Sequence, residues 1–163
     1  TDERKLTIDF SDPYYESDLV IVVRKDSPYA AATALADFSG AKITAQLNTF
    51  HYTVIDQIPG VSLQTAMDTF PTMIVALSAG AIDGYVSERP GAESAVATNP
   101  NLTYVSFADG SGFAADPADT TIAVGVAKGS ELTAKINEAL AAISEDERVE
   151  IMAAALAAQP SAE

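Results

Sequence analysis

The sequence contains no cysteine and no tryptophan, and His51 is its only histidine. Without cysteine the chain can form no disulfide, bind no metal through thiolates and use no cysteine nucleophile. A Ser/His/Asp triad or a multi-histidine metal site would have to be built around one imidazole. We therefore expect no catalytic residue, no metal and no cofactor, and we expect His51 to line a cleft or lie on a helix surface.

Basic residues are few: 9 Lys and Arg stand against 23 Asp and Glu, for a formal net charge of -14. Such a charge repels the phosphates of nucleic acids and anionic lipid headgroups. No apolar run reaches the roughly 20 residues that span a bilayer, and no basic start followed by an apolar segment marks an export signal. We expect no nucleic-acid partner and no insertion of this chain into a membrane.

Hydrophobic residues make up 48% of the sequence, and their pattern predicts alternating strands and helices. Residues 19–23 (LVIVV) are continuously apolar, which is typical of a strand buried on both faces. Further strands are predicted at 42–47, 61–64, 83–87 and 102–106, and helices at 49–58, at 69–80 and after Pro90. This order predicts βαβ units on a mostly parallel sheet, in a compact α/β lobe.

Residues 108–118 are rich in Ala, Gly, Asp, Ser and Pro, which predicts a connector from this lobe to a second packed unit. Residues 121–126 predict a strand there. A helix is predicted next, with an apolar face of four residues: Leu132, Ile136, Leu140 and Ile143. Ser144 and Glu147 have the spacing of a capping box, which predicts the start of a final helix.

The start of the chain carries a family resemblance. Residues 1–4 read TDER and residues 8–15 read IDFSDPYY, which closely resembles the T-x-E-R…(I/V)-x-F-S-x-P-Y-Y segment of amino-acid-binding proteins of bacterial ABC importers. The resemblance continues through 19–23, 35–42, 76–86 and 127–130. It implies an α/β fold of the type II periplasmic-binding class, in which two lobes joined by two crossover strands close over a zwitterionic amino acid.

The resemblance also implies a division of the chain. Residues 19–115 are expected to form a complete lobe 2. Residues 1–18 are expected to be a lobe 1 remnant with the first crossover, and residues 119–163 the second crossover with the C-terminal helices of lobe 1. The N-terminal part of lobe 1 has no counterpart, so we expect a truncated chain with exposed apolar surface on the remnant and a tendency to self-associate.

Ligand-binding roles follow from the same resemblance. Arg4 is expected to bind the ligand's α-carboxylate, because a guanidinium offers two parallel N–H donors. Thr49 and the backbone of Phe50 are expected to bind it too, at the start of a helix; the family usually has Gly-Thr-Thr or Gly-Thr-Gly where this chain has Asn48, Thr49 and Phe50. Glu88, where the family more often has aspartate, is expected to bind the α-ammonium. The alternatives are a surface cation, a simple N-cap and a surface glutamate.

Selectivity for the ligand's side chain is expected from Gln46, His51 and Ser87, together with the part of lobe 1 that has no counterpart. Gln46 and His51 could donate hydrogen bonds to an amide or guanidinium, or be ordinary surface residues. Which amino acid binds is left open.

The leading hypothesis is an extracytoplasmic solute-binding protein, periplasmic or lipid-anchored at the cell surface. It would capture a polar amino acid such as Gln, His, Lys or Arg and deliver it to ABC permease subunits. Two alternatives share the fold: the sensing domain of a receptor kinase or channel, and an enzyme resembling cyclohexadienyl dehydratase with Glu88 as general base.

Overall fold

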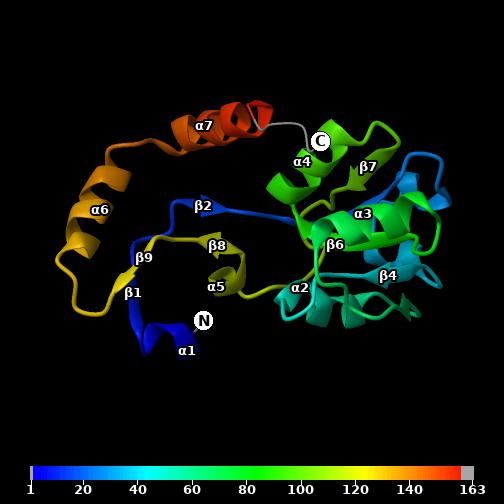
Figure 1. Ribbon diagram of the computed structural model, residues 1–163, viewed down its shortest axis with the longest axis horizontal. Helices are drawn as coiled ribbons and strands as arrows, with labels where there is room; N and C mark the ends of the chain where they lie inside the picture. Colours follow the sequence, from blue (N-terminus) through cyan, green and yellow to red (C-terminus); the bar gives the residue numbers. More distant parts are fainter. Residues whose placement is uncertain (1, 159–163) are drawn as a thin grey trace. The chain divides into compact units, whose positions relative to one another are not determined.

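The computed structural model describes residues 2–158 (Figure 1). Within them the chain forms two compact units. We call residues 18–115 the central unit, and residues 2–17 with 116–158 the terminal unit. Thr1 and residues 159–163, which the predicted lobe 1 segments include, lie outside the described residues.

The central unit is built on one five-stranded sheet. Its strands, in spatial order, are β5 (Ser62–Leu63), β4 (Lys42–Thr44), β6 (Gly84–Glu88), β3 (Leu19–Arg24) and β7 (Leu102–Val105). β4 runs parallel to β5 and β6, whereas β3 runs antiparallel to both β6 and β7. The sheet is therefore mixed: β5, β4, β6 and β7 run in one direction and β3 runs against them, so the prediction of a mostly parallel sheet holds for four of its five strands. The apolar run at residues 19–23 indicated that β3 is buried, but not its direction, because a strand of either direction can be buried on both faces.

Strand β3 is buried on both faces, as predicted. The first five of its side chains are 0–7% exposed, and they point alternately into two apolar clusters. Leu19, Ile21 and Val23 pack in one cluster, and Val20 and Val22 in the other. Burying an aliphatic side chain contributes about 1.5–3 kcal/mol, so β3 anchors both halves of this core.

Two α-helices cover the Val20/Val22 face, α3 (Phe70–Ser78) and α4 (Arg89–Thr98). Helix α3 begins after Thr69, whose hydroxyl accepts a hydrogen bond from the Thr72 N–H, and Pro71 occupies its first turn. Met73 and Leu77, from the predicted apolar face, are fully buried. The helix predicted over 69–80 is thereby confirmed.

Short helical turns lie on the opposite face of the sheet: η1 (Pro28–Ala31), η2 (Leu35–Phe38), α2 (Phe50–Thr53) and η3 (Val54–Gln57). The single helix predicted over 49–58 is wrong in form, because one α-helical turn passes into a 3₁₀ turn. Val54 and Ile55 are both buried there. The tighter 3₁₀ turn ends at Gln57, and its extended C-cap Ile58 directly precedes Pro59. A residue before proline is disfavoured in the helical region.

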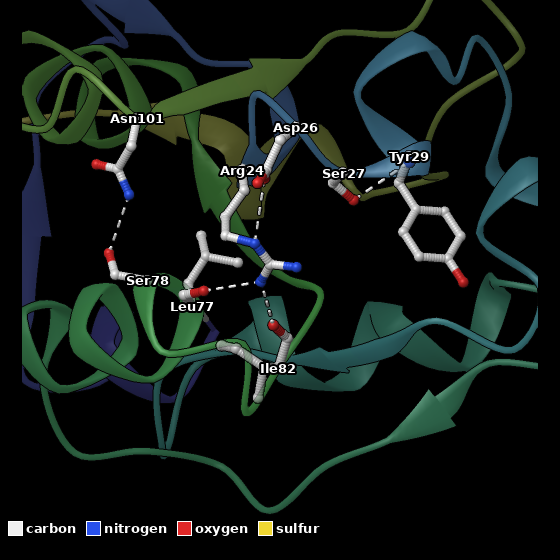
Figure 2. Close-up of polar contacts among 8 residues, drawn as sticks. All are labelled: Arg24, Asp26, Ser27, Tyr29, Leu77, Ser78, Ile82 and Asn101. Carbon is white, nitrogen blue, oxygen red and sulfur yellow. Dashed lines mark hydrogen bonds and ion pairs between the residues drawn. The ribbon is translucent and has the colours of Figure 1, made fainter.

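Arg24, at the end of β3, ties the sheet to the end of α3 (Figure 2). Its Nη1 donates to the carbonyl oxygens of Leu77 at 2.8 Å and Ile82 at 3.2 Å. Between those two carbonyls the chain turns through Gly80, whose φ of 74° is in the left-handed region that favours glycine. A β3 side chain thus donates both to a carbonyl in the last turn of α3 and to a carbonyl of the loop that follows it.

The terminal unit contains two short antiparallel strand pairs. β1 (Ile8–Phe10) pairs with β9 (Gly125–Ala127), and β2 (Tyr15–Glu16) pairs with β8 (Thr121–Ile122). The single strand predicted over 121–126 is therefore divided in two. Pro13 lies in the opposing segment, and it has no N–H to continue the ladder.

The other elements of the terminal unit are α1 (Asp2–Lys5), α5 (Pro117–Thr120), α6 (Leu132–Ala141) and α7 (Glu145–Ala157). The predicted capping box at the start of α7 is present: the Glu147 carboxylate accepts from the Ser144 N–H at 2.9 Å, and the Ser144 hydroxyl accepts from the Glu147 N–H at 3.3 Å. On α6 the predicted apolar face is only half-buried, and Leu132 is 54% exposed.

Apolar burial differs between the units. Among the described residues, every fully buried apolar side chain belongs to the central unit. Val149 and Ile151 on α7 are 56% and 58% exposed. The self-association expected from the sequence stays a prediction. Within residues 2–158, no helix is both long and apolar enough to cross a membrane.

Candidate functional site

Six of the seven residues predicted for the site come from two segments at one edge of the central sheet. Gln46, Thr49, Phe50 and His51 follow β4, and Ser87 and Glu88 end β6. Because β4 and β6 are parallel neighbours, their carboxyl ends meet at the same edge, where ligands bind in open α/β sheets. We call residues 46–51 together with Glu88 the β4/β6 edge.

A polar contact between the two segments of the β4/β6 edge joins His51 to Glu88. His51 Nε2 lies 3.6 Å from Glu88 Oε1, and the two side chains are 11% and 31% exposed. This separation is longer than a hydrogen bond and within reach of an ion pair. The Phe50 ring packs against the imidazole, with centroids 4.4 Å apart and planes inclined by 34°.

The chain turns sharply between β4 and α2. Asn48 has a φ of 61°, a conformation that glycine adopts freely and asparagine tolerates better than most residues. Asparagine can therefore stand where the resembling family has glycine. The Thr49 hydroxyl donates to the Gln46 carbonyl at 2.7 Å, and Gln46 Nε2 donates to the Asp68 carbonyl at 3.1 Å.

Thr49 occupies the N-cap position of α2, but its side chain makes no capping hydrogen bond there. Its hydroxyl points its proton back to Gln46, which fixes the turn. Since α2 has only four residues, little macrodipole accumulates along it, and any attraction for an anion would come from the local N–H groups of the first turn.

Ser87 differs from its neighbour. Its side chain is fully buried, and its Oγ donates to the Glu88 carbonyl at 3.0 Å. Successive strand residues point to opposite faces, so Ser87 and Glu88 do not share a face of the sheet. A Cβ added at Gly91 would lie 2.9 Å from Ser87 Oγ, which shows how closely α4 covers that hydroxyl.

The cation next to Glu88 along the chain is already paired. Arg89 Nη2 lies 2.7 Å from Asp18 Oδ2, and the Arg89 N–H donates to the Asp18 carbonyl. The hydrogen bond to the Asp18 carboxylate raises the pKa of Arg89. Asp18 thus holds this guanidinium, while Glu88 faces the imidazole of His51.

Arg4 belongs to the terminal unit, in the single turn of α1. It is exposed, and its carbonyl accepts from the Thr7 N–H at 3.1 Å and the Thr7 hydroxyl at 3.2 Å. Both contacts involve the Arg4 carbonyl and not its guanidinium. Across the part of the chain that the structure describes, no group of three or more His, Cys, Asp or Glu side chains could hold a metal ion.

Sequence reasoning placed His51 and Glu88 in the site separately but missed their contact. They are far apart along the chain, and only the parallel pairing of β4 with β6 brings them together. The one available signal was that both residues follow predicted strands of the same sheet.

The fold is that of a known family of bacterial proteins. Residues 1–155 match the model of the bacterial extracellular solute-binding proteins, family 3, and the chain belongs to this family. The resemblance predicted from the sequence is confirmed, as is the type II periplasmic-binding fold.

Relatives and solved structures point to amino-acid binding proteins. ABC transporter arginine-binding protein 1 of Escherichia coli (strain K12) is 30% identical over 155 residues, which are 90% of this chain and 58% of the relative. A probable histidine-binding protein of Campylobacter jejuni is 32% identical over 107 residues, 66% of this chain and 40% of the relative. The matched part of the chain thus spans 58% of the first relative and 40% of the second.

Among solved structures, an amino acid ABC transporter substrate-binding protein from Streptococcus pneumoniae, bound to L-arginine, superposes with a TM-score of 0.76 at 27% identity. The match covers 96% of this chain and 64% of that one. Holo ArgBP from T. maritima gives a TM-score of 0.67 at 28% identity, covering 91% and 63%.

Proposed function

We propose that this protein captures a polar amino acid outside the cytoplasm for delivery to an ABC permease. The observation that carries the proposal is the partly exposed Glu88 carboxylate at the carboxyl end of β6, 3.6 Å from His51 in the helical turn that follows Asn48 and Thr49. A carboxylate at such an edge suits the α-ammonium of an amino acid. We assign the α-carboxylate to Arg4 and to the N–H groups of the turn, following the family resemblance.

The comparisons support this assignment of ligand class. The named relatives are arginine- and histidine-binding proteins, and the neighbouring structures hold arginine or, in an ancestral arginine-binding protein, glutamine. All three are polar amino acids. Gln46 and His51 supply polar groups near Glu88 that could select such side chains. The Ser87 hydroxyl is covered by α4, so we leave it out of the proposed contacts.

We also propose that the central unit is lobe 2 of the family fold and that the terminal unit belongs to lobe 1.

Calorimetric titration with a panel of amino acids tests the proposed function. The panel contains arginine, histidine, glutamine, lysine and, as apolar control, leucine. It is titrated against residues 1–163 and against the longest natural protein that contains them. We expect the longer protein to bind polar members tightly. The chain alone should bind weakly, because it spans 58% of the arginine-binding relative.

Arg4→Ala in the longer protein should reduce affinity by at least tenfold, because it removes a charged hydrogen-bonding partner of the carboxylate. Lys5→Ala removes the same charge one residue away and is the matched control. Unchanged affinity in Arg4→Ala would remove Arg4 from the site. A longer protein that binds no amino acid would contradict the proposal as a whole.

A further inference from the structure

His51 is the only imidazole of the chain, and it is enclosed at the β4/β6 edge. The residue is 9% exposed, and both ring nitrogens are buried with no hydrogen-bond partner within the described residues. A buried polar group without a partner is costly to keep. An apolar residue would fill this place more favourably, so the imidazole calls for a role that uses its nitrogens.

The group that faces those nitrogens is the carboxylate of Glu88, 3.6 Å from Nε2. The packing of Phe50 against the ring restricts the imidazole to this neighbourhood. Histidine is the side chain that ordinarily changes charge between about pH 5 and pH 8. Protonation of His51 would therefore place a positive charge directly beside the carboxylate.

We propose that His51 is a proton-linked positioning residue for Glu88. The inference rests on the proposed function, in which Glu88 binds the ligand's α-ammonium. A neutral His51 leaves the whole charge of Glu88 to the ligand. A protonated His51 pairs with Glu88 and repels the ligand's ammonium. The imidazolium of His51 and the ammonium of the ligand therefore compete for one carboxylate. By linkage, ligand binding favours neutral His51, and affinity falls as the pH falls.

Other charges near His51 do not replace Glu88 in this role. Helix α2 packs against β6 and η3, and the charged groups on these elements and next to them are Glu88, Asp56, Arg89 and Asp83. Asp83 precedes the other end of β6, where its carboxylate accepts from the Lys42 N–H at 2.9 Å. Asp56 is exposed. Arg89 is held by Asp18 at 2.7 Å. Glu88 is thus the charged group whose contact with His51 the structure records.

The contact itself is tested without ligand, by NMR of the His51 imidazole in residues 1–163 between pH 5 and pH 8. A single histidine gives one set of imidazole signals, so no assignment is needed. We expect Glu88→Gln to lower the protonated fraction of His51 at pH 6.5, because the stabilising carboxylate is gone. Asp56→Asn, which removes the same charge without contact, should leave it unchanged. Equal curves for Glu88→Gln and the wild type would overturn the inference.

The functional part is tested by calorimetry on the longer natural protein at pH 7.5 and pH 5.5. Arginine and glutamine are the probes, because neither side chain titrates in this range. We expect wild-type affinity to fall by about tenfold at pH 5.5. His51→Gln keeps an N–H donor but takes up no proton. The affinity of this variant should therefore differ by less than about twofold between pH 7.5 and pH 5.5.

Two results would overturn the inference alone: binding of wild-type protein that is equal at both pH values, or the same pH dependence in His51→Gln. If His51 instead contacts the ligand's side chain, His51→Gln will change the ratio of arginine to glutamine affinity and keep the pH dependence. Failure of either amino acid to bind at any pH contradicts the proposed function itself. Thermal unfolding of each variant shows that it is folded.

Discussion

Single side chains in the central unit hold the ends of its helices in place. The guanidinium of Arg24 reaches the Leu77 carbonyl in the last turn of α3 and the Ile82 carbonyl in the loop that follows (Figure 2). Asn101 Nδ2 reaches the hydroxyl of Ser78, the last residue of α3, at 3.4 Å. The ion pair of Arg24 with Asp26, 3.4 Å apart, adds little, because Asp26 is 85% exposed. The carbonyl contacts therefore make Arg24 important for stability.

Replacing Arg24 with alanine should destabilise the protein by about 1.5–3 kcal/mol, since it leaves partly buried carbonyls without a charged donor. Lys25→Ala removes the same charge from an exposed neighbour and should change stability by less than about 0.5 kcal/mol. Urea unfolding of both variants measures the difference. Equal midpoints in the two variants would show that Arg24 acts only as a surface charge.

The sequence could place residues relative to the strands where a local motif carried them, but it could not show which residues they contact. Thr49 and Glu88 were placed by the motif and by position after a strand. The orientation of Ser87 could have been anticipated from strand alternation relative to Glu88. The His51 contact depends on which strands are neighbours, and no local pattern encodes that.

At the scale of elements, the start of α7 is defined by its capping box. Hydrogen bonds from the Ser144 N–H and hydroxyl hold the pKa of Glu147 below its usual value of 4.5. A carboxylate whose pKa is lowered in the folded state stabilises that state above its unfolded pKa. The contribution is lost as the pH falls through the folded pKa.

Ser144→Ala should therefore lower the thermal stability of the protein at pH 7, by about 0.5–2 kcal/mol for a lost N-cap. Glu147→Gln should make the difference in stability between pH 7 and pH 3 smaller than it is in the wild type. Glu145→Gln, in the same first turn but outside the box, is the control for charge alone. Melting curves followed by circular dichroism report these effects. A Glu145→Gln variant with the same pH dependence as Glu147→Gln would contradict the capping role.

Elements defined by nearby residues were predicted well, and those defined by distant ones were not. The α3 start at Thr69 and Pro71 and the α7 capping box follow from spacings of a few residues. The direction of β3 depends on where the chain enters the sheet. The division of residues 121–126 into two strands depends on Pro13, in a partner segment far away in the sequence.

At the scale of the whole molecule, the buried apolar side chains among the described residues lie in the central unit. Local stability follows apolar burial, so amides of β3 and β6 should exchange with solvent most slowly. Those of β1 and β9, which pair in short strands, should exchange at least about tenfold faster. Hydrogen exchange followed by mass spectrometry measures this, and β1 amides as protected as those of β3 would contradict it.

The strand pairs of the terminal unit also limit when this unit can fold during synthesis. A ribosome makes β1 and β2 before the central unit and makes their partners β8 and β9 after it. The central unit has all five of its strands within 18–115 and can fold as soon as it emerges. The first-made strands must stay unpaired for that whole interval, which exposes them to chaperones and to pairing with other chains.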